Sequence, residues 1–239
     1  MNSFSVREIT SSQAMQMVMQ HHYSQRVVGC TKAFGLLHEG ELVGCCCFSI
    51  PASYTLCKGI CGDELKGAVY ELSRLVVTTD KKNAASFLIA SSLRALDNRI
   101  IVSYADCNEH VGHVGYVYQA TNWLYTGKGT AEPVWVHPTT GEVISYTRRH
   151  IDIKAANIGL HWTDLTKRKQ SGKHRYVTFA GDSKFKRSAK ESLRYPVLPY
   201  PKGNTTRHDL SSGKARTSLF DDEQIVATTA ARRYNSGSQ

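Results

Sequence analysis

Two charged side chains are predicted on otherwise apolar strand faces, and both could do chemistry. Asp106 closes the short strand IIVSYAD, where a carboxylate is costly to bury unless it is paired or used. Arg74 lies in VYELSRLVV, and strand alternation groups it with Tyr70, Leu72 and Val76. An arginine on such a face pairs with a carboxylate or a phosphate. Asp106 could equally cap the loop that follows it, and the two residues could form a purely structural ion pair.

Histidines beside a tyrosine add candidate metal ligands. His21 and His22 precede Tyr23, and with Asp106 they offer the nitrogen and oxygen ligands that divalent iron accepts. Since neighbouring histidines in an extended segment point in opposite directions, only one, such as His22, can bind a metal together with Asp106. Iron at this pair is a secondary hypothesis.

Positive charge is concentrated near the C-terminus. Residues 1–166 hold 14 basic and 14 acidic residues, whereas 167–202 hold 11 and 2, and 203–239 hold 5 and 4, which gives the net charge of +10. Aromatic residues are interleaved with this charge, which favours nucleic acid over a merely solubilising surface. We therefore expect contacts with a nucleic-acid backbone from Lys167, Arg168, Lys169, Lys173, Arg175, Lys184, Lys186 and Arg187.

The elements that must position these residues alternate between strands and helices. Ser11 or Ser12 can cap a first helix, and Asn83 can cap a second one. A β-hairpin is expected around Glu39-Gly40, and another around Thr140-Gly141. The succession of strand 69–77, helix 83–96 and strand 100–106 implies a parallel crossover, with ligands gathered at the carboxyl ends of the strands.

The remaining stretches predict the overall organisation. Segment 51–67 reads as a long loop that could close over a site, and 203–239 as a disordered tail. We expect a catalytic domain over 1–166 and a basic segment over 167–202 packed on it. The seven cysteines lack a C-x-x-C pair and are expected to be reduced. Neither a membrane span nor a signal peptide is predicted, so we expect a cytoplasmic protein without a membrane partner.

Several motifs resemble one protein family. The order of elements is that of the GNAT acyltransferase fold, an α/β (α+β) mixed sheet with an antiparallel N-terminal hairpin and a parallel central strand pair flanked by helices. The specific similarity is to the Mom family of bacteriophage DNA-modification proteins, and spans residues 20–202. It rests on HHYSQ at 21–25, ELSRLVV at 71–77, KNAASFLIASSLR at 82–94, SYAD at 103–106, YQATNWLYTG at 118–127, KHRYVTF at 173–179 and PVLPYPK at 196–202.

This resemblance implies an enzyme that adds a methylcarbamoyl group, formerly described as acetamido, to N6 of adenine in phage DNA. The modification would shield the DNA from restriction endonucleases in the host cytoplasm. Asp106 would then accept a proton from N6, and Tyr118 would protonate the departing thiolate. Tyr23 would orient the substrate or relay a proton. Because N6 is paired inside a duplex, the base must be extruded or single-stranded. Tyr54, Tyr104 and Trp123 are stacking candidates, and a core role for Trp123 is an equally strong interpretation.

The donor site is expected at the start of the second helix. Ser86 and the amides of Asn83, Ala84 and Ala85 would bind an anion there. The stretch KKNAAS contains no glycine, unlike the usual pyrophosphate loop. An acyl-CoA-type donor is therefore implied only by the resemblance in fold and not by these residues. Two rival functions stay open: an acyltransferase for a small amine or a protein lysine, and a non-catalytic DNA-binding protein.

Overall fold

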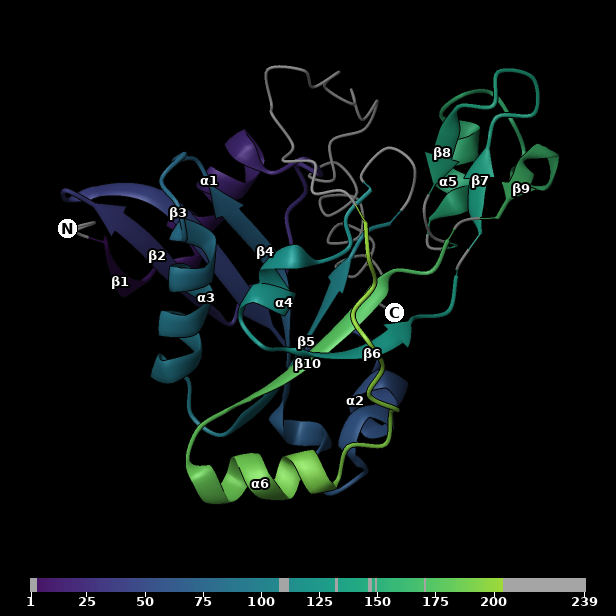
Figure 1. Ribbon diagram of the computed structural model, residues 1–239. Coiled ribbons are helices and arrows are strands. Elements are labelled where there is room, and N and C mark those ends of the chain that lie inside the picture. The colour runs from purple at the N-terminus through teal and green to yellow at the C-terminus, as the bar shows by residue number, and fades with distance from the viewer. Residues whose placement is uncertain are drawn as a thin grey trace, which may run out of the picture.

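A computed structural model describes residues 4–107, 112–131, 133–145, 148, 150–169 and 171–203 (Figure 1). The tail expected to be disordered lies, from residue 204 onward, outside the described residues. The main sheet has seven strands. In spatial order they are β1 (Phe4–Ile9), β2 (Lys32–His38), β3 (Glu41–Ser49), β4 (Val69–Val77), β5 (Arg99–Ala105), β10 (His174–Ala180) and β6 (Leu124–Lys128).

Two central strands of this sheet run parallel, and every other neighbouring pair is antiparallel. β4 pairs with β5 only from Val69–Ile100 to Glu71–Val102, and beyond this point the strands separate (Figure 1). The expected mixed sheet, with an N-terminal hairpin and a parallel central pair, is therefore confirmed. β1 was not predicted, because this edge strand carries alternating polar residues and is short.

Helices cover both faces of the sheet. On one face, α3 (Ala84–Ala95) and α4 (Tyr116–Ala120) pack on an aromatic core that includes Tyr118, Trp123 and Tyr176. On the other face, α1 (Ser11–His21) covers β2 to β4, while α2 (Tyr54–Cys61) and α6 (Ser183–Glu191) cover β4, β5 and β10. Burial of these apolar side chains is the main force that holds the layers together.

Segment 51–67 is not an irregular loop, and that prediction was wrong. It contains α2, which is capped by Ser53 and followed by the short η1 (Lys66–Ala68). Cys57, Ile60 and Cys61 are buried, and they repeat at the i, i+3, i+4 spacing of one helix face. The segment is therefore a packed layer of the fold.

The first helix begins one residue earlier than predicted. Thr10, rather than Ser11 or Ser12, is its N-cap, and Thr10 forms a reciprocal capping box with Gln13. The hairpin turn at Glu39-Gly40 is confirmed, since both residues have positive φ angles between β2 and β3.

A second, three-stranded sheet projects from the edge of the main sheet (Figure 1). Its strands are β8 (Val143–Ser145), β7 (Val134–Val136) and β9 (Thr166–Arg168), accompanied by α5 (Ile151–Ala156) and η2 (Trp162–Asp164). Trp135, Ile151, Ala155 and Leu165 form its own small core. β7 and β8 confirm the second predicted hairpin.

The predicted domain boundary at residues 166 and 167 does not match this architecture. It falls inside β9, and β10 lies between β5 and β6 in the main sheet. The basic segment thus contributes a strand to each sheet and does not pack as a separate unit on a domain formed by residues 1–166. In the described part of the chain, no helix is long and apolar enough to cross a membrane.

Candidate active site

A β-bulge in β4 decides which way its charged residues point. Leu72 pairs with Phe48 and Arg74 with Cys47, so Ser73 is an extra residue in β4. Before it, Leu72 packs in the core under α3, and after it Leu75 packs there. Arg74 therefore points to the opposite face from Leu72. The prediction that they share a face was wrong because simple alternation cannot anticipate a bulge.

The same bulge brings Glu71 to the face of Arg74. Within the described part of the chain, the Glu71 carboxylate has no hydrogen-bond or ion-pair partner. Burial raises the pKa of Glu71, while the positive charges of Arg74 and Lys173 oppose that increase. Glu71 was missed in the sequence because regular alternation separates it from Arg74.

The Arg74 guanidinium has one hydrogen bond to its own strand, and another of its N–H groups has none among the described residues. Its Nη1 donates to the carbonyl of Ser73 at 2.7 Å, while its Nε is buried without a hydrogen-bond partner. Burial lowers the pKa of Arg74, and Tyr23 and Glu71 counteract this effect. A buried guanidinium donor without an acceptor is costly, so this N–H is suited to an acceptor atom of a ligand.

Asp106 follows β5 and forms an ion pair with the residue that precedes β10. Lys173 Nζ lies 3.4 Å from Asp106 Oδ2, and the two side chains are 51% and 14% exposed. The carbonyl of Asp106 accepts from the amide of His113 at 2.8 Å, which joins the end of β5 to the residues just before α4. Asp106 is thus not sealed in the core.

Tyr23 lies close enough to both Asp106 and Arg74 for their charges to affect its pKa. The hydroxyl is partly desolvated although the residue is 43% exposed, and this burial raises the pKa of Tyr23. The negative charge of Asp106 raises it further, and the positive charge of Arg74 lowers it. The Tyr23 ring stacks on His22 at 4.3 Å and lies 6.2 Å from the ring of His113.

Tyr118 lies on the face of the sheet that α3 covers, opposite to Arg74 and Glu71, and its hydroxyl approaches the place where β4 and β5 separate. Its hydroxyl lies 2.8 Å from Ser103 Oγ, which is also 2.8 Å from the carbonyl of Leu72. Burial raises the pKa of Tyr118 to about 12, so it keeps its proton at neutral pH. The single proton of Ser103 can serve Leu72 or a Tyr118 anion, but not both.

A C-terminal strap, residues 195–203, holds α4 in place and was not predicted as a support for the site. Gln119 Nε2 donates to the carbonyl of Pro201, and Tyr200 donates to the carbonyl of Trp123. The Tyr176 hydroxyl donates to the carbonyl of Val114, and a side chain at Gly115 would collide with its ring. These contacts fix the turn that presents Tyr118.

The predicted donor residues lie at the start of α3. Asn83 occupies the N-cap position but adopts a left-handed conformation with φ 63° and makes no side-chain cap. This corrects the capping prediction and explains the missing glycine, because asparagine tolerates that conformation. The Ser86 hydroxyl donates to the carbonyl of Asn83. The first amides of a helix, here including that of Ala85, have no acceptor within the helix, so the predicted anion site at this helix start stays a prediction.

The stacking candidates do not share one place. Trp123 is fully buried in the core, so its predicted contact with a base is wrong. Tyr54 is exposed, but its hydroxyl accepts from Lys66 Nζ at 2.7 Å at the start of α2. Tyr104 is partly buried on the face of Glu71, and burial raises its pKa to about 12. Among these three, Tyr104 lies with the site.

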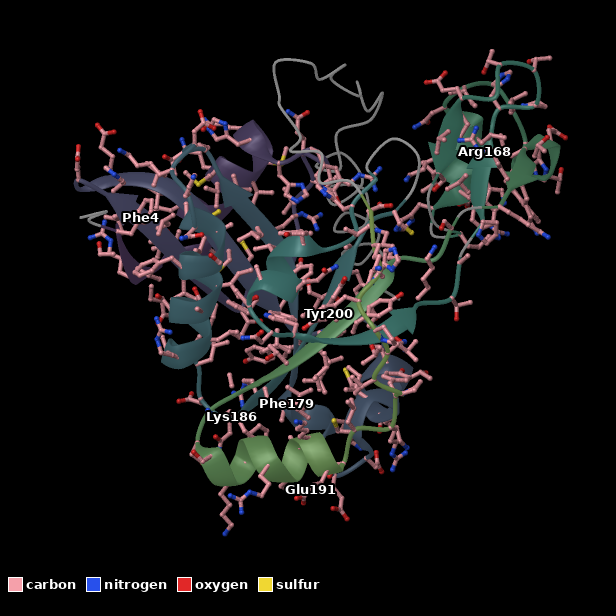
Figure 2. All side chains as sticks on the ribbon, in the orientation of Figure 1. Phe4, Arg168, Phe179, Lys186, Glu191 and Tyr200 are labelled. Carbon is pink, nitrogen blue, oxygen red and sulfur yellow. The ribbon has the colours of Figure 1, made fainter. Side chains whose placement is uncertain are left out.

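The predicted basic surface is divided. Figure 2 shows Arg168 and Lys186 at opposite ends of the molecule. Lys167 and Arg168 lie in β9 of the small sheet, Lys169 follows that strand, and Lys173 lies beside Asp106. Arg175 is bound within the fold: its guanidinium stacks on Tyr195 at 3.5 Å and bonds Thr126. Lys184, Lys186 and Arg187 lie on α6, away from the site.

The described residues contain no cluster of three or more His, Cys, Asp or Glu side chains that could hold a metal ion. His22 Nδ1 accepts from the amide of Ser24 at 3.0 Å. Iron at His22 and Asp106 therefore has no support in this part of the chain.

The fold and this site define a mixed-sheet protein with a polar centre at a separated parallel strand pair. The chain belongs to the Mom protein family, whose model matches residues 3–202. Among curated proteins, no significant match was found.

Solved structures with a similar arrangement are acetyltransferases. An N-acetyltransferase from Staphylococcus aureus has a TM-score of 0.41 at 10% identity, covering 74% of this chain and 98% of its own. The ribosomal-protein-S18-alanine N-acetyltransferase from Escherichia coli has 0.40 at 7%, covering 75% and 96%. A GNAT family acetyltransferase from Elizabethkingia anophelis, solved with acetyl-CoA bound, has 0.39 at 10%, covering 74% and 98%.

Proposed function

We propose that this protein is a transferase that adds a methylcarbamoyl-type group to N6 of adenine in phage DNA, protecting that DNA from host restriction endonucleases. The family supplies the reaction. The Asp106–Lys173 ion pair carries the proposal for this chain, because it joins a partly exposed carboxylate to the lysines that follow β9.

The residues at α3 fit an acyl thioester donor with a phosphorylated handle. Amides at the start of α3 would hold the phosphates, where the left-handed Asn83 gives the loop its required turn. When bound, such a donor supplies an electrophilic carbonyl and a thiolate leaving group. Tyr118 contacts Ser103 just beyond the last paired residues of β4 and β5, and α3 packs on the same face of the sheet, so the reacting end of the donor would meet the polar centre there.

Two proton transfers then fall to side chains of this protein: one from the N6 amine and one to the leaving thiolate. The N6 amine of adenine is a weak nucleophile because its lone pair is delocalised, so Asp106 accepts an N6 proton as the new N–C bond forms. Tyr118 donates its proton to the thiolate as the C–S bond breaks, and Ser103 turns its own proton toward the Tyr118 anion. Arg74 offers its free N–H to the oxygen that gains charge.

An adenine inside a duplex cannot reach these groups, so we infer that the base is extruded or single-stranded. Lys167, Arg168, Lys169 and Lys173 hold the flanking phosphates, while Tyr23 and Tyr104 offer rings for the base. The α6 lysines have no part in this contact because they lie at the other end of the molecule.

The test is nucleoside mass spectrometry of DNA from cells that express the protein. We expect a modified deoxyadenosine with the wild type and none with Asp106→Ala, although this variant still binds DNA. Unmodified deoxyadenosine with the wild type contradicts the proposal and favours an acyltransferase with another acceptor. Full modification with Asp106→Ala contradicts the assigned proton acceptor.

A further inference from the structure

α6 presents cations that the site does not use. Lys184, Lys186, Arg187 and Lys190 are exposed, and none of them forms an ion pair among the described residues. The helix lies across the amino ends of β4 and β5, opposite the ends that carry Arg74 and Asp106 (Figures 1 and 2). This charge therefore needs an explanation separate from the catalytic centre.

The orientation of these cations is fixed by packing. Ala189 is fully buried and Phe185 packs on the core under α6, which forces the charged side chains outward. The Asp182 carboxylate caps the helix through the amide of Phe185 at 2.8 Å and accepts from Asn98 Nδ2 at 3.0 Å. At the other end, the amide of Arg194 donates to Ile60 in α2. The helix is thus a rigid, preorganised cationic surface.

Helix stability does not account for this charge. Lys184 and Lys186 lie in the first turn of α6, where the macrodipole disfavours cations. The Asp182 carboxylate is occupied by the cap, which helps to lower its pKa, and Glu191 at the end of α6 forms no ion pair with these cations among the described residues. A group of exposed cations with no ion-pair partner among the described residues is complementary to an external anionic partner.

A duplex backbone fits this surface better than a membrane does. The rise from Lys184 to Lys190 is about 9 Å, which covers roughly five phosphates of duplex DNA. A helix that inserts into a membrane surface needs an exposed apolar face, whereas the apolar face of α6 is turned into the core.

We propose that the exposed face of α6 (Lys184, Lys186, Arg187 and Lys190) is a second DNA-binding surface, which holds a segment of duplex distant from the target adenine. This inference rests on the proposed function, because it takes DNA to be the substrate. The surface retains the enzyme on long DNA without acting in the transfer step. Short substrates that occupy only the catalytic centre do not need it.

The test compares two variants with the same change in net charge. Lys184→Glu/Arg187→Glu alters α6, and Arg7→Glu/Lys32→Glu alters the distant β1–β2 edge. Binding to a duplex of about 40 base pairs is measured by fluorescence anisotropy between about 50 and 200 mM salt. For the α6 variant we expect the slope of log K against log salt to fall in magnitude by about two, and the affinity at low salt by about tenfold or more. The matched control should keep the wild-type slope.

Modification of a short oligonucleotide separates this proposal from the proposed function. The α6 variant should modify a single strand of about 10 nucleotides at the wild-type rate, and long duplex at a rate lower by about tenfold. An unchanged salt slope, or an equal loss on short and long substrates, overturns the α6 proposal. Absence of modified adenine with every protein, while the slope still changes, overturns the proposed function alone. Glutamate near a helix start is favourable, so circular dichroism should show a folded variant.

Discussion

The two parallel strands contribute carboxylates to the site in different ways. β5 is regular, and Asp106 at its end is stabilised by Lys173 at 3.4 Å. β4 is bulged at Ser73, and its Glu71 is partly buried without a hydrogen-bond or ion-pair partner among the described residues. Asp106 lies beside a cation at the end of its strand, whereas burial raises the pKa of Glu71. From this comparison we propose that Asp106 acts in the transfer step and that Glu71 tunes the charge of the site.

Asp106→Asn should have the largest effect. Asparagine keeps the shape but cannot accept a proton, so the rate of adenine modification should fall by about 10²- to 10³-fold. The measurement is single-turnover modification of a short adenine-containing strand. A rate within a few-fold of the wild type would remove Asp106 from the transfer step and exchange the roles of the two carboxylates.

Glu71→Gln should have a smaller effect that depends on pH. An ionised Glu71 supports the charge of Arg74, so its loss should lower the rate by about tenfold at neutral pH. Because its pKa is raised, wild-type Glu71 gains its proton as pH falls toward the acid range, and the two proteins should converge there. The pH–rate profile checks this. A uniform loss at every pH would mean that Glu71 is needed for shape rather than charge.

Ser103→Ala tests how β5 supports Tyr118. The change removes hydrogen bonds to Leu72 and Tyr118, and the unfolding free energy should fall by about 1–2 kcal/mol. The modification rate should fall by a few-fold, because the Tyr118 anion loses a donor. Urea denaturation and the single-turnover rate measure the two effects. Ser73→Ala is the matched control on β4, since its hydroxyl donates only to the carbonyl of Cys47.

β4 and β5 also show what the sequence could predict. Apolar runs and turn residues were sufficient for both strands, the crossover and the position of Asp106, because these depend on local patterns. Glu71 and Arg74 point to the same face of the sheet because β4 has one extra residue, Ser73, in its pairing with β3. Such a bulge arises from tertiary contacts and cannot be recognised in a local pattern. The division of the basic residues has a similar origin, since β10 enters the middle of the main sheet.

Glu71→Gln should finally have a small effect on stability, in the opposite direction to its effect on activity. The folded-state pKa of Glu71 lies above its ordinary value of 4.5, so the folded protein binds this proton more tightly than the unfolded chain. Below the unfolded pKa both states are protonated and the carboxyl costs nothing. As pH rises through the window up to the folded pKa, the unfolded chain ionises first and stability is lost.

Glutamine removes that cost, so the variant should match the wild type near pH 3 and melt higher at pH 7, by on the order of 1–2 °C. Thermal unfolding followed by circular dichroism at the two pH values measures the difference. Asp106→Asn is the matched comparison, because removing the partner of Lys173 should lower rather than raise the melting temperature at pH 7. If the melting temperatures of both variants shift equally and in the same direction at pH 7, the two carboxylates have the same effect on stability. That result would contradict the contrast between a carboxylate paired with Lys173 and a partly buried one that has no ion-pair partner among the described residues.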